Sequence, residues 1–345
     1  MSLMSKIYYV ELDYPKQRNG VGKYVASSKA TCDVTKILCD NFDVERVRIT
    51  RHFLNKILGS LEFLLTFFWA ICKIPKGSFV FMQYPLINLG IFKYCYKSLA
   101  KFNAITIVHD LQSYRYPHFK HFRQLELDIL NAHKHVIVHS ESMKKRLVAD
   151  GVRTHIVVLE LFDYLLDDAN TAHWIPQKIV FAGALEKSIF LNDLKKIDFR
   201  SFSINLYGRD CPTIDLGNSA QYKGKFLPSD VSPIEGEWGL LWDGDSAFDC
   251  VGNFGEYLTL IAPHKLSLYL ACGYKVIVWE KSAMADFVKK NHIGVLIRSL
   301  EEIPQKLSQI TAQENEEILR NVRNVSCQIR HGEMFKNALN ACLGD

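Results

Sequence analysis

Residues 261–279 read IAPHKLSLYLACGYKVIVW and indicate a helix followed directly by a strand. Pro263 suits the first position of a helix, because its missing N–H would be unpaired there in any case. Apolar residues recur at helical spacing as far as Gly273, and glycine suits the left-handed residue that often ends a helix. The β-branched run at residues 276–278 is typical of a buried strand. This stretch therefore predicts a helix that opens on a loop and feeds a central strand.

The first turn of the predicted helix carries His264 and Lys265. Free backbone N–H groups and the positive end of the helix dipole attract an anion, and a lysine adds a full charge. A nucleotide phosphate fits such a site. The alternative is a solvated lysine on a helix that only packs, and this stretch alone leaves both interpretations open.

Short strand-like runs alternate with helical patterns along the rest of the chain. They form two series, separated by the polar and acidic residues 163–176, which we expect to be a linker. The first series lies at 7–12, 44–49, 79–84, 105–110, 136–140 and 156–161, and the second at 179–183, 203–208, 238–244, 275–279 and 294–297. Nearly continuous Val, Ile and Phe indicate strands covered on both faces. We therefore predict an α/β protein of two doubly wound, Rossmann-like domains, residues 1–165 and 166–345, with ligands bound in the cleft between them.

The composition is that of a globular protein with mild positive charge. The 345 residues are 48% hydrophobic, enough for two cores, and carry a formal net charge of +5. Positive charge concentrates between Arg46 and Lys101, a range that contains nine basic residues and a single acidic residue, Glu62. Nine cysteines with no Cys-x-x-Cys pair argue against a disulfide scaffold or a structural zinc site. Together with the lack of a recognisable signal peptide, they favour a cytoplasmic location.

The most apolar stretch of the chain is residues 57–74, interrupted by Glu62 and marginal in length for a bilayer span. A helix that is apolar nearly all round is usually buried, so we expect a core helix. Because basic residues surround it, a membrane-surface patch is the alternative.

Two motifs of the first half follow predicted strands. Asn19 and Gly20 precede Gly22, and such glycines let the backbone approach a ligand, although a plain flexible turn explains them equally well. His109 and Asp110 end the fourth strand, where one of them could take a proton from an acceptor hydroxyl. A structural histidine beside a turn-capping aspartate is the alternative. His139, after the next strand, is a weaker candidate of the same kind.

Cations follow two predicted strands of the second half. Lys187 follows the strand that ends at Gly183, and Arg209 follows Tyr207 and Gly208. Together with Lys265 these residues would place two or three cations around one cleft, which favours a phosphate site over a solvated surface. The ring of Tyr207 offers a face on which a base could stack. Asp243, after a further strand, could bind sugar hydroxyls, hold a metal or cap a turn, and capping is the most common of these.

The order of these motifs resembles a group of bacterial GT-B glycosyltransferases that includes β-1,6-galactofuranosyltransferases and an adhesin glucosyltransferase. The resemblance rests on Asn19-Gly20, His109-Asp110, FAGALEK at 181–187, Tyr207-Gly208, GLLWDG at 239–244 and PHKLSLYL at 263–270, and spans almost the whole chain. It implies a GT-B fold whose C-terminal domain binds a UDP-sugar and whose N-terminal domain binds a saccharide acceptor. The terminal helix would cross back to the N-terminal domain.

By position, the resemblance also implies roles for single residues. Lys265 and Lys187 would contact the diphosphate and Tyr207 the uracil, with Asp243 and His264 nearby. Asn19 and Gly20 would border the donor sugar and phosphate, and His109 or Asp110 would lie on the acceptor side. The Glu-x7-Glu helix motif that many retaining GT-B enzymes carry is absent from this sequence, which leaves the stereochemistry of transfer open.

The resulting expectation is a hexosyltransferase that moves galactofuranose, galactose or glucose from UDP during bacterial surface-glycan assembly. No metal or other cofactor is expected, because GT-B enzymes stabilise the departing diphosphate with protein cations and a helix dipole. The expected partners are a UDP-sugar and a lipid-linked or protein-linked saccharide, with no nucleic acid, and with membrane contact and homo-oligomers left open. Two rivals are another nucleotide-dependent enzyme of doubly wound fold and a non-catalytic partner of a glycan-assembly complex.

Overall fold

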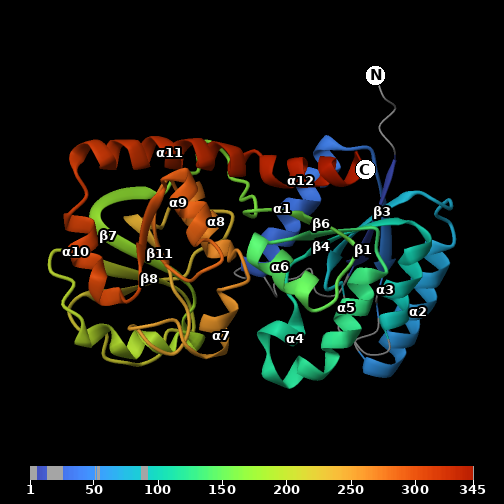
Figure 1. Cartoon of the computed structure of the whole chain (residues 1–345), viewed down its shortest axis with the longest axis horizontal. Coiled ribbons are helices and arrows are strands. Elements are labelled where there is room, and N and C mark those ends of the chain that lie inside the picture. The colour runs from blue at the N-terminus through green and yellow to red at the C-terminus, as the bar shows by residue number, and fades with distance from the viewer. Residues whose placement is uncertain (1–5, 14–25, 51, 53–54, 87–91, 345) are drawn as a thin grey trace.

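The computed structural model describes residues 6–13, 26–50, 52, 55–86 and 92–344 (Figure 1). Two six-stranded parallel sheets lie side by side, one in each half of the chain. The N-terminal sheet has the order β2-β1-β3-β4-β5-β6, with β1 (Ile7–Asp13), β2 (Val44–Thr50), β3 (Phe79–Tyr84), β4 (Asn103–Val108), β5 (His135–Val138) and β6 (His155–Val158). The C-terminal sheet has the order β12-β11-β10-β7-β8-β9, with β7 (His173–Ala184), β8 (Ser203–Arg209), β9 (Ala220–Gly224), β10 (Glu235–Leu241), β11 (Lys275–Trp279) and β12 (Gly294–Ile297). The prediction of two doubly wound halves is confirmed.

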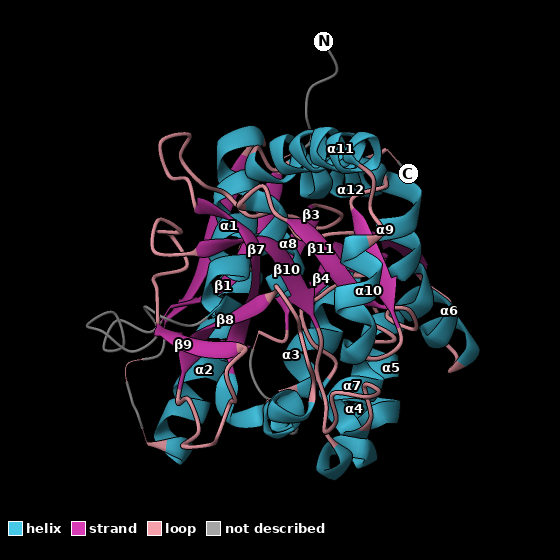
Figure 2. Ribbon diagram, turned by 90° about the vertical axis from the view of Figure 1, so that its left-hand side faces the viewer, coloured by secondary structure: helices cyan, strands magenta, loops and turns pink. Residues whose placement is uncertain are grey.

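Helices cover both faces of each sheet (Figures 1 and 2). The first half contains α1 (Ala26–Asn41), α2 (Lys56–Ile71), α3 (Lys93–Ser98), α4 (Gln112–Arg115), α5 (Arg123–Asn131) and α6 (Glu141–Ala149). The second half contains α7 (Gly252–Tyr257), α8 (His264–Ala271), α9 (Ala285–Asn291), α10 (Ile303–Ser308), α11 (Ala312–Arg330) and α12 (Glu333–Leu343). Short 3₁₀ turns lie at Leu99–Lys101, Pro117–Phe122, Leu185–Lys187, Ile189–Lys196 and Leu300–Glu302. Because successive strand residues point to opposite faces, each sheet is packed on both sides by a separate apolar cluster.

The last helix, α12, returns to the N-terminal sheet, as Figure 1 shows. The chain turns at Gly332, whose φ of 79° is in the left-handed region that favours glycine. A Cβ at this position would also lie only 2.7 Å from the side chain of Ile37. Phe335 then packs on Phe81 of β3 with ring centroids 5.4 Å apart. Asp163 caps the start of α12 by accepting hydrogen bonds from the backbone N–H groups of Met334 and Phe335. The buried Asp163 therefore ties the connection between the halves to the end of the chain.

Two details differ from the sequence-based expectations. The linker is shorter than residues 163–176, because β7 already begins at His173 and includes Trp174. The edge strand β9 was not predicted, since its sequence AQYKG lacks the apolar run that marked the other strands.

The helix α2 differs most from expectation. Phe63, Phe67 and Ile71 are buried on the side of the helix that packs against β2 and α3, but several large apolar side chains of the same helix are exposed. The prediction of a helix buried all round is therefore wrong. No helix in the described part of the chain combines the length and the apolar character needed to cross a bilayer.

Candidate active site

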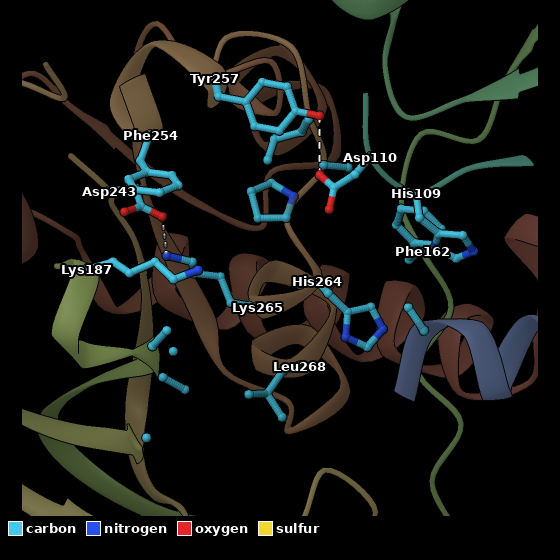
Figure 3. A pocket seen from close by; sticks show the side chains of 18 of the residues that line it. His109, Asp110, Phe162, Lys187, Asp243, Phe254, Tyr257, His264, Lys265 and Leu268 are labelled. Carbon is cyan, nitrogen blue, oxygen red and sulfur yellow. Dashed lines mark hydrogen bonds and ion pairs between the residues drawn. The ribbon is translucent and has the colours of Figure 1, made fainter. Parts of the chain in front are cut away.

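A cavity of about 820 Å³ lies between the two halves, at the carboxyl ends of strands from both sheets. This is the position in which open parallel sheets bind ligands. The N-terminal half contributes side chains that follow β3, β4 and β5, and the C-terminal half contributes the ends of β7, β8 and β10 together with the start of α8. Of the residues predicted for the site, the cavity lining contains His109, Asp110, Lys187, Asp243, His264 and Lys265 (Figure 3).

The start of α8 is held at the cavity by Tyr269, one turn further along the helix. Its hydroxyl accepts a hydrogen bond from the backbone N–H of Ala182 at 2.9 Å, at the end of β7. Its ring lies so close to β10 that a Cβ on Gly239 would be 2.1 Å away from it. The helix begins at His264, with Pro263 as the preceding cap, one residue later than predicted. Because Tyr269 fixes the helix to two strands, the N–H groups of its first turn are held at the cavity wall.

Lys265 and Lys187 bring positive charge to this wall, and Figure 3 shows both side chains in the same part of the site. The Lys265 amine donates to the backbone carbonyl of Trp242 at 2.9 Å and to Asp243 at 3.3 Å. The Lys187 amine lies 5.4 Å from the ring centroid of Phe254. Asp243 therefore positions Lys265 and partly offsets its charge.

Further cations line the same cavity. Arg209 is the last residue of β8, and Lys225 follows β9. The ends of β7 and β8, which also line the cavity, approach so closely that a Cβ on Gly208 would lie 1.9 Å from the carbonyl oxygen of Gly183. With Lys187 and Lys265, the C-terminal half presents four cations against two carboxylates, Glu186 and Asp243. The wall is therefore suited to a dianionic or trianionic group.

His264 lies at the boundary between the halves. Its ring stacks on Tyr164 with centroids 4.9 Å apart, and its ring nitrogens are buried without a hydrogen-bond partner of good geometry among the described residues. Burial, and to a lesser degree the charge of Lys29, lowers the pKa of His264 to about 3. The imidazole is therefore neutral at physiological pH and keeps polar atoms at the cavity for a ligand to pair with.

His109 is oriented by Gln83, which lies on the preceding strand of the sheet. The Gln83 amide nitrogen donates to the backbone carbonyl of Thr31 and to the hydroxyl of Tyr9, so its oxygen faces His109. The Nε2 atom of His109, 2.6 Å from that oxygen, must therefore carry the ring proton, which leaves Nδ1 as an acceptor. Burial, followed by the neighbouring His139 and His264, lowers the pKa of His109 to about 3. His109 is thus a neutral hydrogen-bonding group and a weak base.

Asp110 is held in an ion pair with Arg115, Oδ2 to Nη1 at 2.5 Å, and accepts a hydrogen bond from Tyr257 at 3.3 Å (Figure 3). A buried carboxylate, Glu126, fixes the start of α4 by accepting hydrogen bonds from the backbone N–H groups of Gln112 and Ser113. It also accepts from Tyr84 at 2.9 Å. Glu126 therefore holds in place the backbone that carries Asp110 and Arg115 at the cavity.

His139 is structural in this fold. Its Nε2 donates to the backbone carbonyl of Val108 at 2.9 Å, and its Nδ1 accepts from the N–H of Ala262 at 3.2 Å. Ser140 donates to the carbonyl of Leu260 at 2.6 Å. Because both ring nitrogens are used, His139 joins the N-terminal sheet to the loop before α8 and has no atom left for proton transfer.

Tyr207 lies in the core and not in the cavity. Only 1% of the residue is exposed, and its ring packs edge-on against Phe226. Its hydroxyl donates to the carbonyl of Pro233 and accepts from the N–H of Glu235. The prediction that a base stacks on Tyr207 is therefore wrong in this structure, because Phe226 covers the ring and lines the cavity in its place. Asn19 and Gly20 lie outside the described residues.

Several lining residues were not predicted. Gln83 is the penultimate residue of a strand, and that position could have identified it. Arg115, Phe254 and Tyr257 come from the short helices α4 and α7, and only folding brings them to the cleft. Across the described ranges, no group of three or more His, Cys, Asp or Glu side chains gathers closely enough to hold a metal ion.

The sequence is similar to those of known proteins and family models. The model described as "Glucosyltransferase 3-like, C-terminal domain" matches residues 179–342, and the corresponding N-terminal model matches residues 16–161. The β-1,6-galactofuranosyltransferase WbbI of Escherichia coli K12 is 28% identical over 93% of this chain and 95% of its own length. Glucosyltransferase 3 of Streptococcus gordonii is 26% identical over 78% of this chain and 80% of its own.

Solved structures show the same fold at low sequence identity. HepE of Anabaena, solved with UDP and glucose, superimposes with a TM-score of 0.56 at 13% identity, covering 99% of both chains. WaaG, a glycosyltransferase involved in lipopolysaccharide biosynthesis, gives a TM-score of 0.56 at 9% identity over 99% of this chain and all of its own.

Fold, cleft and relatives together define a glycosyltransferase of the GT-B class. The two domain models cover most of the sequence in the expected order. The chain belongs to the glucosyltransferase 3-like family. The alternative of a non-catalytic partner protein is not supported, because the named relatives are transferases.

Proposed function

We propose that the protein transfers a hexose (galactofuranose, galactose or glucose) from UDP to a saccharide in the assembly of a bacterial surface polysaccharide or glycoprotein. The observation that carries the proposal is that Lys187, Arg209, Lys225 and Lys265 line one cavity together with the start of α8. The names of the relatives, a galactofuranosyltransferase and a glucosyltransferase, support the choice of sugars. A neighbour of the same fold that was solved with UDP and glucose supports the nucleotide.

In the proposed reaction the acceptor hydroxyl oxygen forms a bond to the anomeric carbon, and the bond from that carbon to the phosphate oxygen breaks. UDP leaves with the electron pair, and the lysines and the first-turn N–H groups of α8 stabilise its charge. The hydroxyl proton passes to the carboxylate of Asp110, which lines the cavity beside Arg115. His109 is a poor proton acceptor, because burial lowers its pKa to about 3. His109 then orients the acceptor through a hydrogen bond at Nδ1. No metal is needed in this scheme, since protein cations neutralise the diphosphate.

The acceptor in this proposal is a saccharide linked to a lipid or a protein, bound from the side of Asp110, Arg115 and Tyr116. The reaction would take place in the cytoplasm, with peripheral contact at the inner face of the membrane for a lipid-linked acceptor. Self-association of the chain is compatible with the proposal but is not required by it.

A ligand screen tests the proposed donor. Thermal unfolding should shift upward with UDP in excess and remain unchanged with NAD, because only a ligand of the folded state stabilises it. Incubation with UDP-glucose, UDP-galactose and UDP-galactofuranose in the presence of EDTA should release UDP from one of them. No shift with UDP, or UDP release that depends wholly on an added divalent metal, would contradict the proposal.

A further inference from the structure

The solvent-facing side of α2 is an apolar stripe made of six large side chains. The exposed fractions are 79% for Ile57, 52% for Leu58, 54% for Leu61, 64% for Leu65, 38% for Phe68 and 66% for Trp69. At 100° per residue these positions fall within about 120° of the helix circumference. Phe63, Phe67 and Ile71 lie on the opposite side, where they fill the core. The helix therefore has two apolar faces, and its packing in the protein uses only one of them.

The stripe continues into positive charge. The Lys73 amine lies 3.0 Å from the centroid of the Trp69 ring, and Lys76 follows in the next turn, with both lysines exposed. In the described part of the chain neither lysine forms an ion pair. The single acidic residue of the helix, Glu62, is largely covered, and its carboxylate accepts hydrogen bonds from the ring and the backbone N–H of His52.

We infer that α2 docks this protein on a membrane surface that carries anionic lipid. An apolar stripe of leucines and aromatic rings, with lysines at its end, matches a helix lying in the plane of a bilayer interface. A tryptophan whose ring supports an ammonium group is suited to the boundary between acyl chains and headgroups. The helix is too short and too closely packed on its own sheet to span the bilayer, so it binds along its length.

Charge decides between a bilayer and a second copy of the chain. Two copies meeting through this face would bring their lysines together, since the described residues of the stripe offer no carboxylate to pair with them. Anionic headgroups complement the same lysines, and each lysine near such a surface strengthens binding by roughly fivefold. The observed charge therefore favours the lipid surface.

The position of α2 connects the docking surface to the proposed function, on which this part of the inference rests. The helix follows β2, so its start lies at the carboxyl edge of the N-terminal sheet, the edge that also carries the cavity. Figure 1 shows α2 on the side of the N-terminal half that faces away from the C-terminal half. A protein bound through α2 keeps its C-terminal half in solution and exposed to the soluble donor. The N-terminal half then lies where a lipid-linked acceptor would be presented.

Vesicle flotation tests the inference. The full-length protein should float with vesicles of equal parts phosphatidylglycerol and phosphatidylcholine at low salt, and far less with phosphatidylcholine alone. The Leu61→Ser/Leu65→Ser variant should bind at least tenfold more weakly, because two exposed apolar side chains no longer enter the interface. Lys73→Glu/Lys76→Glu should bind anionic vesicles weakly and lose its sensitivity to salt.

Val148→Ser/Ile189→Ser is the matched control, since both residues are exposed and apolar but lie away from α2. It should float like the parent protein. Absence of flotation with anionic vesicles would overturn the inference, as would a dimer in solution that the leucine variant separates without any vesicle binding. All variants are compared by their thermal shift with UDP, which should be unchanged, so a failure of membrane binding is distinguishable from a failure of the proposed transferase function.

Discussion

Stability should fall steeply as the pH drops from 7.5 to 5.5, because four histidines are held neutral inside the protein. Burial is the main cause in each case, and it lowers the pKa to about 3 for His109 and His264 and about 4 for His133 and His139. The unfolded chain takes up these protons near pH 6.5, whereas the folded chain does not. Protonation therefore favours the unfolded state below pH 6.5, and the loss continues until the pH approaches the folded values.

The size of the effect follows from the same pKa values. Between pH 7.5 and 5.5 each histidine costs at most about 1.4 kcal/mol, so the four together cost roughly 5 kcal/mol. Asp163 acts in the opposite direction, because burial raises its pKa to about 7. The folded protein takes up this proton as the pH falls through 7, and the unfolded protein does not. Protonation of Asp163 therefore raises the free energy of unfolding by about 2 kcal/mol over the same pH range. The net loss should be about 3 kcal/mol.

Urea unfolding at pH 7.5, 6.5 and 5.5 measures this change directly. Two variants should move the pH dependence in opposite directions. Asp163→Asn removes the compensating group and should steepen the loss to about 5 kcal/mol. His264→Phe keeps a ring on Tyr164 but removes one proton site, and should reduce the loss by about 1.4 kcal/mol. A free energy of unfolding that does not change with pH, or the same pH dependence in all three proteins, would refute the reasoning.

The remaining predictions concern single residues of the site. Tyr207→Phe should lower stability by about 1–3 kcal/mol in urea unfolding without changing UDP affinity, since two backbone groups lose their buried partner. Glu126→Gln should lower kcat more than tenfold without changing UDP affinity, because the amide NH2 group would face the Ser113 N–H and could not accept its hydrogen bond. An unchanged kcat would show that Glu126 is not needed to position Asp110. Asp110→Asn should lower kcat roughly a hundredfold and His109→Ala less, and the reverse order would make His109 the base.

The sequence predicted the features that depend on local patterns. The buried parallel strands were visible as continuous Val, Ile and Phe, and the two ends of α8 were visible from Pro263 and Gly273. The strand-end residues His109, Asp110 and Lys187 reached the cavity because carboxyl ends of parallel strands meet at one edge of a sheet.

The failures came from features that only tertiary packing decides. Tyr207 also follows a strand-end pattern, but Phe226, which follows the unpredicted strand β9, covers its ring. The apolar residues of α2 predicted burial, yet hydrophobicity alone does not say how many faces of a helix find a partner. Gln83 and Glu126 act by positioning His109 and the loop after Asp110, and such contacts have no signature in the sequence.

Calorimetric titration of UDP into the protein and its lysine variants tests the central claim most directly. Lys187→Met and Lys265→Met should each weaken UDP binding about ten- to a hundredfold, because a charge-assisted contact to the diphosphate contributes roughly 1.5–3 kcal/mol. Lys281→Met, which removes an exposed lysine of the same half outside the cavity, should bind UDP like the parent protein. Undetectable UDP binding by the parent, or equal affinity in all four proteins, would contradict the assignment of this cavity to a UDP-sugar.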